Sequence, residues 1–427
     1  MTARLSVDSF DLLLDRLDLS AEPVVARHAG LCLRSHFQPI YSLAHGRVVG
    51  HEALLRASDA QGRPVSPPEV FAVCDDFAEL LWRDRLARMV HVANYLQAPA
   101  ADQWLFVNIH PQVFAHGLGR TAVDGFLQRM HQRFPMPHHR VVIEVMEEAV
   151  SDDADFQTAV ERARAAGYLI ALDDFGAGHS NFDRVWRLRP EIVKLDRSLV
   201  TRAADDAAAR RIVVQMVSLL HECGALVLME GVETEAEAHV ALEADADLVQ
   251  GYLFGRPQPA LVPPDEPLPR LHALSDDFEA QSRRDKQRYR ERIGPYINAI
   301  GYAAALLSAG RSLDEACRSF LELPEADVCY LLGSDGRQIG DNRWAAAEPA
   351  DRSLAYEPLR DTQGAGWARR PYFRRAVEAV GKVQVTRPYR TLHGGRLCVT
   401  VSAAFPVIDD SGASALQVIC GDLHWAS

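Results

Sequence analysis

Residues 168–182, "YLIALDDFGAGHSNF", join an apolar run, two adjacent aspartates and a glycine-rich turn. The run up to Leu172 is continuously apolar, as in a strand that is covered on both faces. Carboxylates that lie side by side repel each other unless a cation neutralises them. The stretch therefore predicts a buried strand that presents Asp173 and Asp174 to a bound cation.

The same pattern recurs along the chain. Runs of β-branched and aliphatic residues with a polar residue late in the run, or just after it, occur at 105–109, 140–145, 191–196, 225–231 and 247–255. The stretches 154–167 and 207–224 have apolar residues at helical spacing and end in glycine, a common helix stop. Over roughly 250 residues, this alternation predicts an α/β fold, a TIM-like (β/α)8 barrel.

The polar residues of these runs are expected to meet, because a parallel barrel brings the carboxyl ends of its strands to one rim. They are Asn108, Glu144, Asp173, Asp174, Lys194, Glu230 and Gln250. Hard oxygen ligands of this kind suit Mg²⁺ or Mn²⁺. Adjacent aspartates are expected to point in different directions, so that one could bridge two ions while the other serves one.

Two alternatives stand beside this interpretation. A single acidic residue after a strand is more often a helix N-cap or a solvated loop charge, and Lys194 could be a salt-bridge partner, since a buried lysine is costly unless paired. Asp75 and Asp76 are expected to be exposed, because they lie in the helical pattern of residues 67–90. The preceding strand, the following Gly176 and Gly178, and the matching strand ends favour function for the pair at 173–174.

Residues 37–57, "FQPIYSLAHGRVVGHEALLRA", predict two extended runs around a turn at His45 and Gly46, with Glu52 near the end of the second run. With this stretch the motifs form an ordered set: "FQPI", "HEALLR", "FVNIH", "VIEVMEE", "LDDFGAG", "VKLD", "MEGVE" and "QGYLFGRP". This set resembles the EAL-domain family of cyclic-di-GMP phosphodiesterases over about residues 25 to 260.

The resemblance implies metal-dependent hydrolysis of cyclic-di-GMP to linear pGpG, with two Mg²⁺ or Mn²⁺ ions per active site. It implies metal ligands at Glu52, Asn108, Glu144 and Asp173, with Asp173 bridging to a second ion at Asp174 and Glu230. It implies catalytic roles for Glu52, Lys194, Glu233 and Gln250, and substrate contacts from Gln38, Leu54, Arg56 and Asp196. Glu147 would steady the loop after the paired aspartates.

Two other functions remain open: a receptor or scaffold that binds the dinucleotide without cutting it, and a two-metal barrel that acts on another phosphoester. Receptors of this family typically lose metal ligands, whereas every ligand position here is filled. No Gly-Gly-Asp/Glu-Glu-Phe stretch is present, so cyclase activity is not indicated.

Composition restricts the remaining possibilities. A net charge of −12 argues against broad binding of nucleic acid polymers, which needs a basic surface. No stretch approaches the roughly 20 apolar residues of a membrane span, and residues 1–20 form an acidic amphipathic pattern, expected to be an N-terminal helix, without a signal core. Seven scattered cysteines without a C-x-x-C spacing fit neither a disulfide framework nor a thiolate zinc site. We therefore expect a cytoplasmic protein.

The proline-rich residues 255–270 predict a domain boundary. We expect a phosphodiesterase barrel over 1–262, a linker with connecting helices over 263–310, and an α+β domain over 311–427. Ser275 is expected to cap a charged helix that Gly294 and Pro295 interrupt. The charged face of this helix is expected to be solvated. Dimer contacts along it are an alternative.

From about residue 325, short alternating runs and the hairpin signals "SDG", "HGG" and "DDSG" predict an antiparallel sheet packed on helices. This part resembles Cache and PAS-like sensor modules, which implies a sensory or dimerising role and an unidentified small ligand. The residues that the resemblance implies for the pocket are Trp367, Arg369, Arg370, Tyr372, Tyr389 and Asp422, for which core packing or surface pairing is an equal alternative. The family also implies a homodimer.

Overall fold

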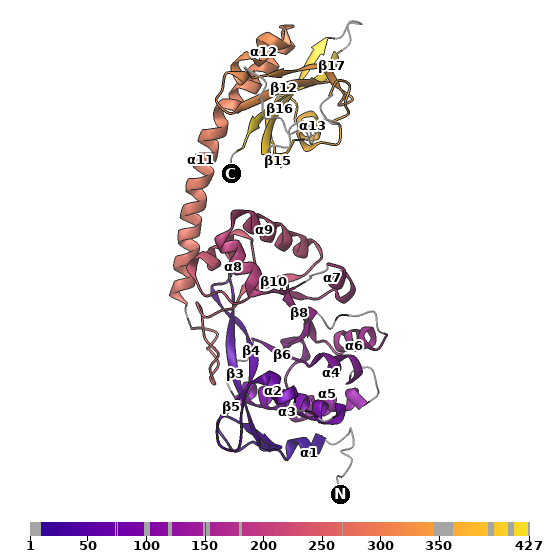
Figure 1. The fold of residues 1–427 in the computed structure, drawn as a ribbon, viewed down its shortest axis with the longest axis vertical. Coiled ribbons are helices and arrows are strands. Elements are labelled where there is room, and N and C mark those ends of the chain that lie inside the picture. Colours follow the sequence, from indigo (N-terminus) through magenta and orange to yellow (C-terminus); the bar gives the residue numbers. More distant parts are fainter. Residues whose placement is uncertain are drawn as a thin grey trace. The chain divides into compact units, whose positions relative to one another are not determined.

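The protein is described by a computed structural model that covers residues 10–425, apart from 73, 75, 98–102, 118–121, 148–149, 151–153, 179–181, 267, 346–361, 392–396 and 409–413. Two compact units are present, residues 1–280 and residues 281–427 (Figure 1). The boundary between them lies inside a long helix. The finer division of the sequence at residues 262 and 310 stays a prediction.

Eight strands of the first unit form a closed barrel, in the order β3-β11-β10-β9-β8-β7-β6-β4, and β4 pairs with β3 to close the ring. The strands are β3 (Leu31–Ser42), β4 (Arg47–Ser58), β6 (Trp104–Asn108), β7 (Val141–Met146), β8 (Leu169–Phe175), β9 (Ile192–Leu195), β10 (Leu226–Met229) and β11 (Leu248–Val249). The predicted TIM-like barrel is confirmed. Short strands β1 (Leu17–Asp18), β2 (Val25–His28) and β5 (Pro64–Val65) extend the sheet beyond β3 and β4.

One barrel strand runs against the others. β3 is antiparallel to both β11 and β4, whereas the remaining neighbours pair in parallel. The cause is local, because the turn predicted at His45 and Gly46 joins β3 to β4 as a hairpin, with Gly46 at φ 62°. The all-parallel pairing expected from the repeated strand and helix units is therefore wrong at this strand.

The run at 247–255 is the other departure from the predicted strands. Only Leu248 and Val249 form a strand. The chain then turns back on Val232, whose carbonyl accepts a hydrogen bond of 3.1 Å from the amide of Leu253. A Cβ at Gly251 would lie 2.0 Å from that carbonyl oxygen, so the turn needs glycine at this position.

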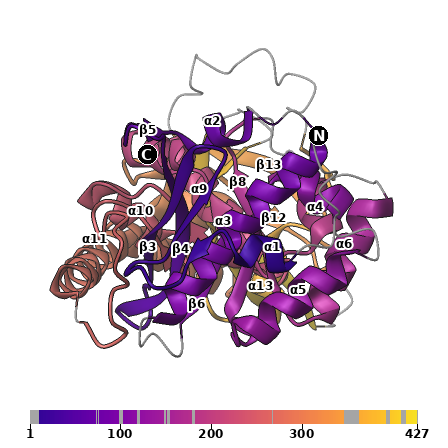
Figure 2. The ribbon, with the colours of Figure 1, turned by 90° about the horizontal axis from the view of Figure 1, so that it is seen from below.

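Helices surround the barrel strands, and Figure 2 shows α4, α5 and α6 along one side of them. The helices of this unit are α1 (Phe10–Leu14), α2 (Pro67–Ala72), α3 (Phe77–Gln97), α4 (Pro111–Gly117), α5 (Ala122–Arg133), α6 (Ala154–Ala165), α7 (Phe182–Leu188), α8 (Arg197–Asp205), α9 (Ala207–Glu222) and α10 (Glu235–Glu243). A 3-10 turn, η1, covers His138–Arg140. The N-terminal helix predicted over residues 1–20 is described only over Phe10–Leu14.

The helical pattern at 67–90 divides into α2 and α3. Asp76 is exposed, as predicted, and its Oδ1 accepts a hydrogen bond of 2.9 Å from the amide of Glu79, which caps the start of α3. Asp75 lies outside the described residues. The carboxylate of Asp76 thus has a structural role at a helix start, unlike the pair at 173–174.

An apolar layer fills the barrel. Seven of its strands each contribute one buried residue to it: Ile40, Phe106, Val142, Ala171, Ile192, Leu228 and Leu248. The eighth strand contributes Gly50, where a Cβ would lie 3.1 Å from the ring of Phe106, so glycine leaves room for that ring. This layer closes the barrel interior beneath the polar strand ends.

The helix α11 (Pro269–Ser308) is continuous, and this contradicts the predicted start at Ser275 and the predicted break at Gly294 and Pro295. The Ser275 hydroxyl donates 3.0 Å to the carbonyl of Leu271, so it lies inside the helix. The proline is accommodated because Ile293, Tyr296 and Ile300 pack into the core of the second unit and hold the helix on both sides of it. None of the described helices combines the length and apolar character of a membrane span.

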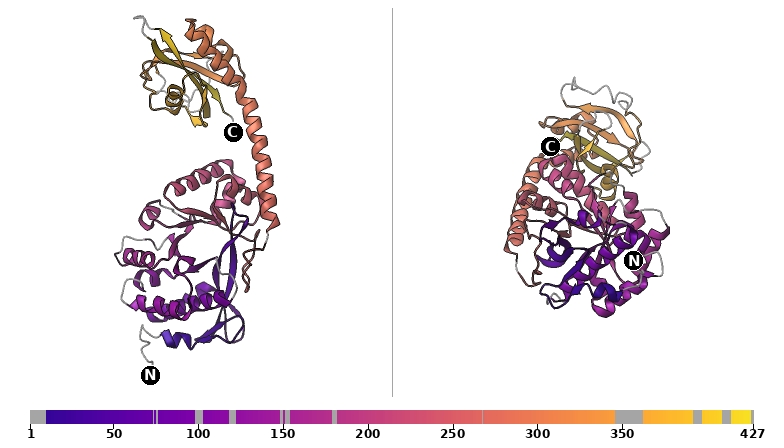
Figure 3. Two further views of the ribbon diagram at one scale, coloured as in Figure 1. Left: turned by 180° about the vertical axis from the view of Figure 1, so that it is seen from behind. Right: turned by 60° about the horizontal axis from the view of Figure 1, so that its bottom comes forward.

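The second unit is an antiparallel sheet in the order β13-β12-β17-β16-β14, with β15 also paired to β16 (Figure 3). Its elements are α12 (Leu313–Leu321), β12 (Ala326–Leu332), β13 (Gln338–Trp344), α13 (Pro371–Glu378), β14 (Gln384–Val385), β15 (Tyr389–Arg390), β16 (Leu397–Ile408) and β17 (Ser414–His424). The predicted antiparallel sheet is confirmed, with its first hairpin turn at residues 334–336. The signals at 393–395 and 409–412 lie outside the described residues.

Both faces of this sheet are covered. Cys329 and Leu331 of β12 face a core that includes Phe320 and the end of α11, while the alternating Val328 and Tyr330 face a second core with Tyr372 of α13. The strand therefore supplies both layers through its two-residue period.

Candidate active site

The polar side chains of the barrel interior form a layer next to the apolar one, toward the carboxyl ends of the parallel strands. In each strand from β6 to β11, the residue two positions after the apolar one is polar, and two-residue spacing keeps both on the interior face. The residues placed in this way are Asn108, Glu144, Asp173, Lys194, Glu230 and Gln250. Glu52 follows Gly50 on β4, and Gln38 precedes Ile40 on the reversed β3.

Lys194 lies at the centre of this group and is 1% exposed. Its Nζ is 2.9 Å from Oδ1 of Asp173, 2.7 Å from Oε1 of Glu230 and 3.9 Å from Oε1 of Glu52, and it also contacts Glu144. Burial alone would lower the pKa of Lys194, but the surrounding carboxylates raise it well above its usual value. The side chain is therefore a paired, charged ammonium.

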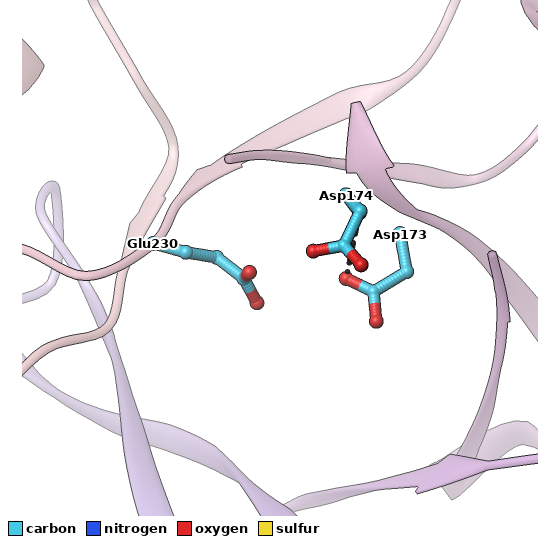
Figure 4. Close-up of side chains that lie close together, drawn as sticks. All are labelled: Asp173, Asp174 and Glu230. Atoms are coloured by element: carbon cyan, nitrogen blue, oxygen red, sulfur yellow. Dashed lines mark hydrogen bonds between the residues drawn. The ribbon is translucent and has the colours of Figure 1, made fainter. Parts of the chain in front are cut away.

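The adjacent aspartates converge, which differs from the prediction that they point apart. The pairing of β8 with β9 shifts register between Leu172 and Phe175, and Asp174 has a left-handed backbone with φ 57°. A bulge of this kind turns the second side chain toward the first. One carboxylate oxygen each from Asp173, Asp174 and Glu230 lies within 4.8 Å of the others (Figure 4). The amide of Asp174 donates 3.0 Å to Oδ1 of Asp173.

Glu52 connects the two sides of the barrel. Its Oε1 accepts 3.1 Å from Nδ2 of Asn108, and its Oε2 accepts 2.7 Å from Nε2 of Gln250. Both amides thus orient this carboxylate toward the centre. The order β6-β4-β3-β11 brings the strands that carry these residues together.

Carboxyl groups outnumber ammonium groups in this cluster, since one ammonium faces the carboxyl groups of Glu52, Glu144, Asp173, Asp174 and Glu230. Burial, aided by Glu52 and Asp173, raises the pKa of Glu144 well above its usual value. Burial also raises the pKa of Glu230 to about 8, although Lys194 opposes the shift. A bound cation would oppose these shifts in pKa, because it favours the ionised forms of the carboxyl groups.

Two acceptor oxygens in the group have no hydrogen-bond donor among the residues that the structure describes. They are Oε2 of Glu144 and Oε1 of Gln250, and both are buried. Buried acceptors normally have a partner. Together with the convergent carboxylates, they form a set of hard oxygen donors that fits divalent ions such as Mg²⁺ or Mn²⁺.

The predicted substrate residues Gln38, Leu54 and Arg56 lie along the same face as Glu52. Gln38 pairs directly opposite Glu52, and Leu54 and Arg56 follow Glu52 at two-residue spacing on β4. Nε2 of Gln38 donates 3.2 Å to the carbonyl of Gly255, and the Arg56 guanidinium donates 2.9 Å to the carbonyl of Leu55. This face leads outward from the carboxylate cluster.

Asp196 and Glu233 both make structural contacts at the start of α8. Asp196 caps α8 through a hydrogen bond of 2.9 Å from the amide of Ser198, the alternative role expected for an acidic residue after a strand. Glu233 accepts 2.8 Å from the guanidinium of Arg197. Neither carboxylate belongs to the close group of Asp173, Asp174 and Glu230.

Glu147 follows β7 and is buried between two partners. It accepts a hydrogen bond of 3.4 Å from the amide of Gly176 and forms an ion pair of 3.0 Å with Arg184 of α7. Sequence analysis missed Arg184 and Arg197, since a basic residue on a helix has no local sign of its distant partner. Gly176 has φ 102°, and a Cβ there would lie 2.1 Å from Leu199, whereas a Cβ at Gly178 would meet no atom of the described residues within 4 Å.

The family is established by sequence. The profile of the EAL domain matches residues 27–257, which is more than half of the chain. The chain belongs to the EAL domain family. The match ends just after Gly255, whose carbonyl contacts Gln38, so it includes every residue of the cluster.

Relatives of this EAL-domain chain include two proteins of Pseudomonas aeruginosa. The bifunctional diguanylate cyclase/cyclic di-GMP phosphodiesterase MucR is 31% identical over 53% of this chain and 33% of its own length. The cyclic di-GMP phosphodiesterase RocR is 27% identical over 53% of this chain and 57% of its own length. The chain thus spans between a third and just over half of the length of these relatives.

A solved structure shares the fold of nearly the whole chain. The crystal structure of the Bacillus subtilis YkuI protein, with an EAL domain, covers 92% of this chain and 97% of its own, with a TM-score of 0.74 and 19% identity. That protein was solved in complex with the substrate c-di-GMP and calcium. The likeness extends to the second unit as a fold.

Proposed function

We propose that this EAL-domain chain hydrolyses cyclic-di-GMP to linear pGpG with the help of divalent ions, Mg²⁺ or Mn²⁺. The observation that carries the proposal is the convergence of Asp173, Asp174 and Glu230 beside the buried Glu144 and Glu52. The activity printed for MucR and RocR supports the choice of substrate, as does the c-di-GMP complex of YkuI.

Two ions would be held by different parts of the cluster. Glu52, Asn108, Glu144 and Asp173 would hold one, and Asp173, Asp174 and Glu230 would hold the other. Such ions lower the pKa of water and stabilise the attacking and leaving oxygens of a phosphodiester. The bulge at Asp173 and Asp174 supports this division, because it turns both carboxylates to the same centre.

The side chains around the carboxylates would position the substrate and the attacking water. Lys194 keeps its Nζ charged beside Asp173 and Glu230, where it can orient a water and offset charge on the phosphate. Gln250 orients Glu52 through Nε2, and its buried Oε1 is left to accept from that water. Arg56 would meet a phosphate of the dinucleotide, with Gln38 and Leu54 on the same face. Glu147 would hold the loop at Gly176.

Asp196 and Glu233 would act as supporting residues. Asp196 holds the start of α8 directly after β9, the strand of Lys194, and Glu233 holds Arg197 at the same helix start. A direct contact of Asp196 with substrate and a catalytic role of Glu233 stay predictions of the sequence.

The test is incubation of the full chain with cyclic-di-GMP and either Mg²⁺ or Mn²⁺, followed by chromatography of the products. We expect pGpG to form and EDTA to abolish its formation. Tight binding of cyclic-di-GMP without any pGpG would favour the receptor function instead. Cleavage of bis(p-nitrophenyl) phosphate without cleavage of cyclic-di-GMP would favour a different phosphoester as substrate.

Three further parts of the function stay predictions. They are control of hydrolysis by the second unit, a homodimer, and a location in the cytoplasm. Light scattering of the full chain tests the oligomeric state. Comparison of the full chain with one that carries a disabled ligand pocket in the second unit tests the control.

A further inference from the structure

The hairpin of β3 and β4 carries basic side chains next to the carboxylate cluster. β4 pairs with β6 only over residues 50–53, so the later part of β4 and the facing part of β3 continue outward beyond that strand. On the face that Glu52 occupies, this outer part carries Arg56 on β4 and His36 and Arg34 on β3. Positive charge therefore follows the carboxylates along one face of the hairpin.

Arg34 and Arg56 lie directly opposite each other on the two strands. Like charges in this position repel and destabilise a strand pair. The Arg56 guanidinium donates 2.9 Å to the carbonyl of Leu55, and neither guanidinium has an ion pair with a described residue. Asp59, the acidic residue that follows β4, pairs instead with Arg63 at 2.7 Å. The two guanidinium groups are therefore available to share a bound anion.

His36 lies on the same face and responds to both charges. Burial, and then the positive charges of Arg56 and Arg34, lower the pKa of His36. The imidazole thus favours its neutral form, and the two arginines remain as the permanent charges. The next residue, Phe37, exchanges backbone hydrogen bonds of 2.7 and 3.1 Å with Gln258, which hold β3 at its other edge. The hairpin is therefore fixed before a ligand arrives.

The spacing along β4 determines which group of a ligand can meet this pair. Four residues, or about 13 Å of strand, separate the Cα atoms of Glu52 and Arg56. A phosphate attacked at ions beside Glu52 lies at one end of this distance. Cyclic-di-GMP contains two phosphodiesters, each with a negative charge. The second phosphodiester is the group that can extend toward the arginines.

We propose that Arg34 and Arg56 together bind the phosphate of cyclic-di-GMP that is not attacked, which makes Arg34 a further substrate-binding residue. Guanidinium forks match phosphate oxygens through paired N–H donors, and the shared anion offsets the repulsion between the two arginines. Arg34 precedes the motif "FQPI" at 37–40, so the motifs did not indicate it. The assignment rests on cyclic-di-GMP as the ligand of the barrel.

Steady-state hydrolysis of cyclic-di-GMP tests the role of Arg34. Arg34→Gln should raise KM by about five- to tenfold and leave kcat within about twofold, because a contact with the unattacked phosphate is equally strong before and during the reaction. Arg47→Gln removes the same charge from an exposed position at the start of β4 and should leave KM within about twofold. Equal KM values for the two variants, or a loss in kcat as large as the rise in KM, would overturn the proposal.

Titration calorimetry with cyclic-di-GMP and Ca²⁺ separates this proposal from the proposed hydrolysis. If the wild-type chain binds the dinucleotide but forms no pGpG, Arg34→Gln should still bind about five- to tenfold more weakly than Arg47→Gln. If pGpG forms while the two variants bind equally, the role of Arg34 is overturned and the hydrolysis stands. Failure of the wild-type chain to bind cyclic-di-GMP would overturn both.

Arg34→Lys separates the charge from the shape of the guanidinium. The variant keeps the positive charge but not the paired donors, so its affinity for cyclic-di-GMP should lie between those of the wild-type and Arg34→Gln proteins. Raising NaCl from about 50 to about 300 mM should weaken binding by the wild-type and Arg34→Lys proteins more than by Arg34→Gln. The same salt dependence in all three proteins would show that residue 34 does not meet a charged group of the ligand, against the proposal.

Discussion

The side-chain amide of Gln250 donates a hydrogen bond of 2.7 Å to Oε2 of Glu52, although 198 residues separate them in the chain. They meet because β3 lies between β4 and β11 and completes the ring of strands. Each residue stands two positions beyond a residue packed at the apolar layer, Leu248 for Gln250 and Gly50 for Glu52. The site therefore depends on closure of the barrel as much as on the identity of its residues.

Asp173→Ala should lower the rate of pGpG formation by more than about a hundredfold, because it removes the carboxylate shared by both proposed ions. Chromatography of the products measures the rate. Asp276→Ala, an exposed position on α11, is the matched control and should keep the wild-type rate. Turnover that survives Asp173→Ala would contradict the two-ion assignment.

Lys194→Met should destabilise the protein in EDTA by about 3 to 5 kcal/mol, since it leaves buried carboxylates without their ammonium partner. Added Mg²⁺ should restore a larger share of the stability than in the wild-type protein, because the ion takes over the neutralisation. Urea unfolding with and without Mg²⁺ measures both effects. Lys286→Met, exposed on α11, serves as control. An unchanged urea midpoint for Lys194→Met would show that the ammonium does not hold the cluster.

Gly176→Ala and Gly178→Ala should differ although only one residue lies between them. The first places a Cβ 2.1 Å from Leu199 at a backbone φ of 102°, and should cost about 1 to 3 kcal/mol and reduce hydrolysis. The second places a Cβ with no atom of the described part of the chain within 4 Å, and should change the free energy of unfolding by less than about 1 kcal/mol. Thermal unfolding and the pGpG assay measure the pair, and equal losses would refute the role of the turn geometry.

The stability of the second unit should fall as the pH rises from about 4 to about 7. Burial raises the pKa of Asp422 from 3.8 to about 7, so in this range the folded protein keeps a proton that the unfolded chain has lost. The unfolded state is then favoured increasingly with pH, by up to about 4 kcal/mol at pH 7 and above. Burial also raises the pKa values of the adjacent Tyr330, Tyr389 and Cys420, so these groups do not titrate in this range.

Asp422→Asn should flatten this pH dependence, because the amide does not titrate. The measurement is urea unfolding of the wild-type and variant chains at pH 4.5 and pH 7.5. Wild-type and Asp422→Asn proteins with the same pH dependence would show that the Asp422 carboxyl is ionised throughout.

Several features of the barrel follow from short stretches of sequence. The continuous apolar runs predict buried strands, and the polar residues two positions beyond Val142, Ile192 and Leu248 are then expected at one rim. Glu144, Lys194 and Gln250 lie there for this reason. The hairpin at Gly46 and the antiparallel sheet of the second unit also follow from local turn and alternation signals. In each case neighbouring residues alone determine which side of a strand is buried.

Other features required contacts between distant residues. The bulge that turns Asp174 toward Asp173 exists because β8 pairs with β9 out of register, and α11 continues through Pro295 because its apolar residues pack into a core. The pairing of Glu233 with Arg197 likewise depends on the ends of β9 and β10, which precede these two residues, lying side by side in the barrel. Apolar periodicity is a property of adjacent residues and is visible in the chain. The direction and partner of a charged side chain are settled only when closure of the barrel and packing of the sheet bring remote groups within bonding distance.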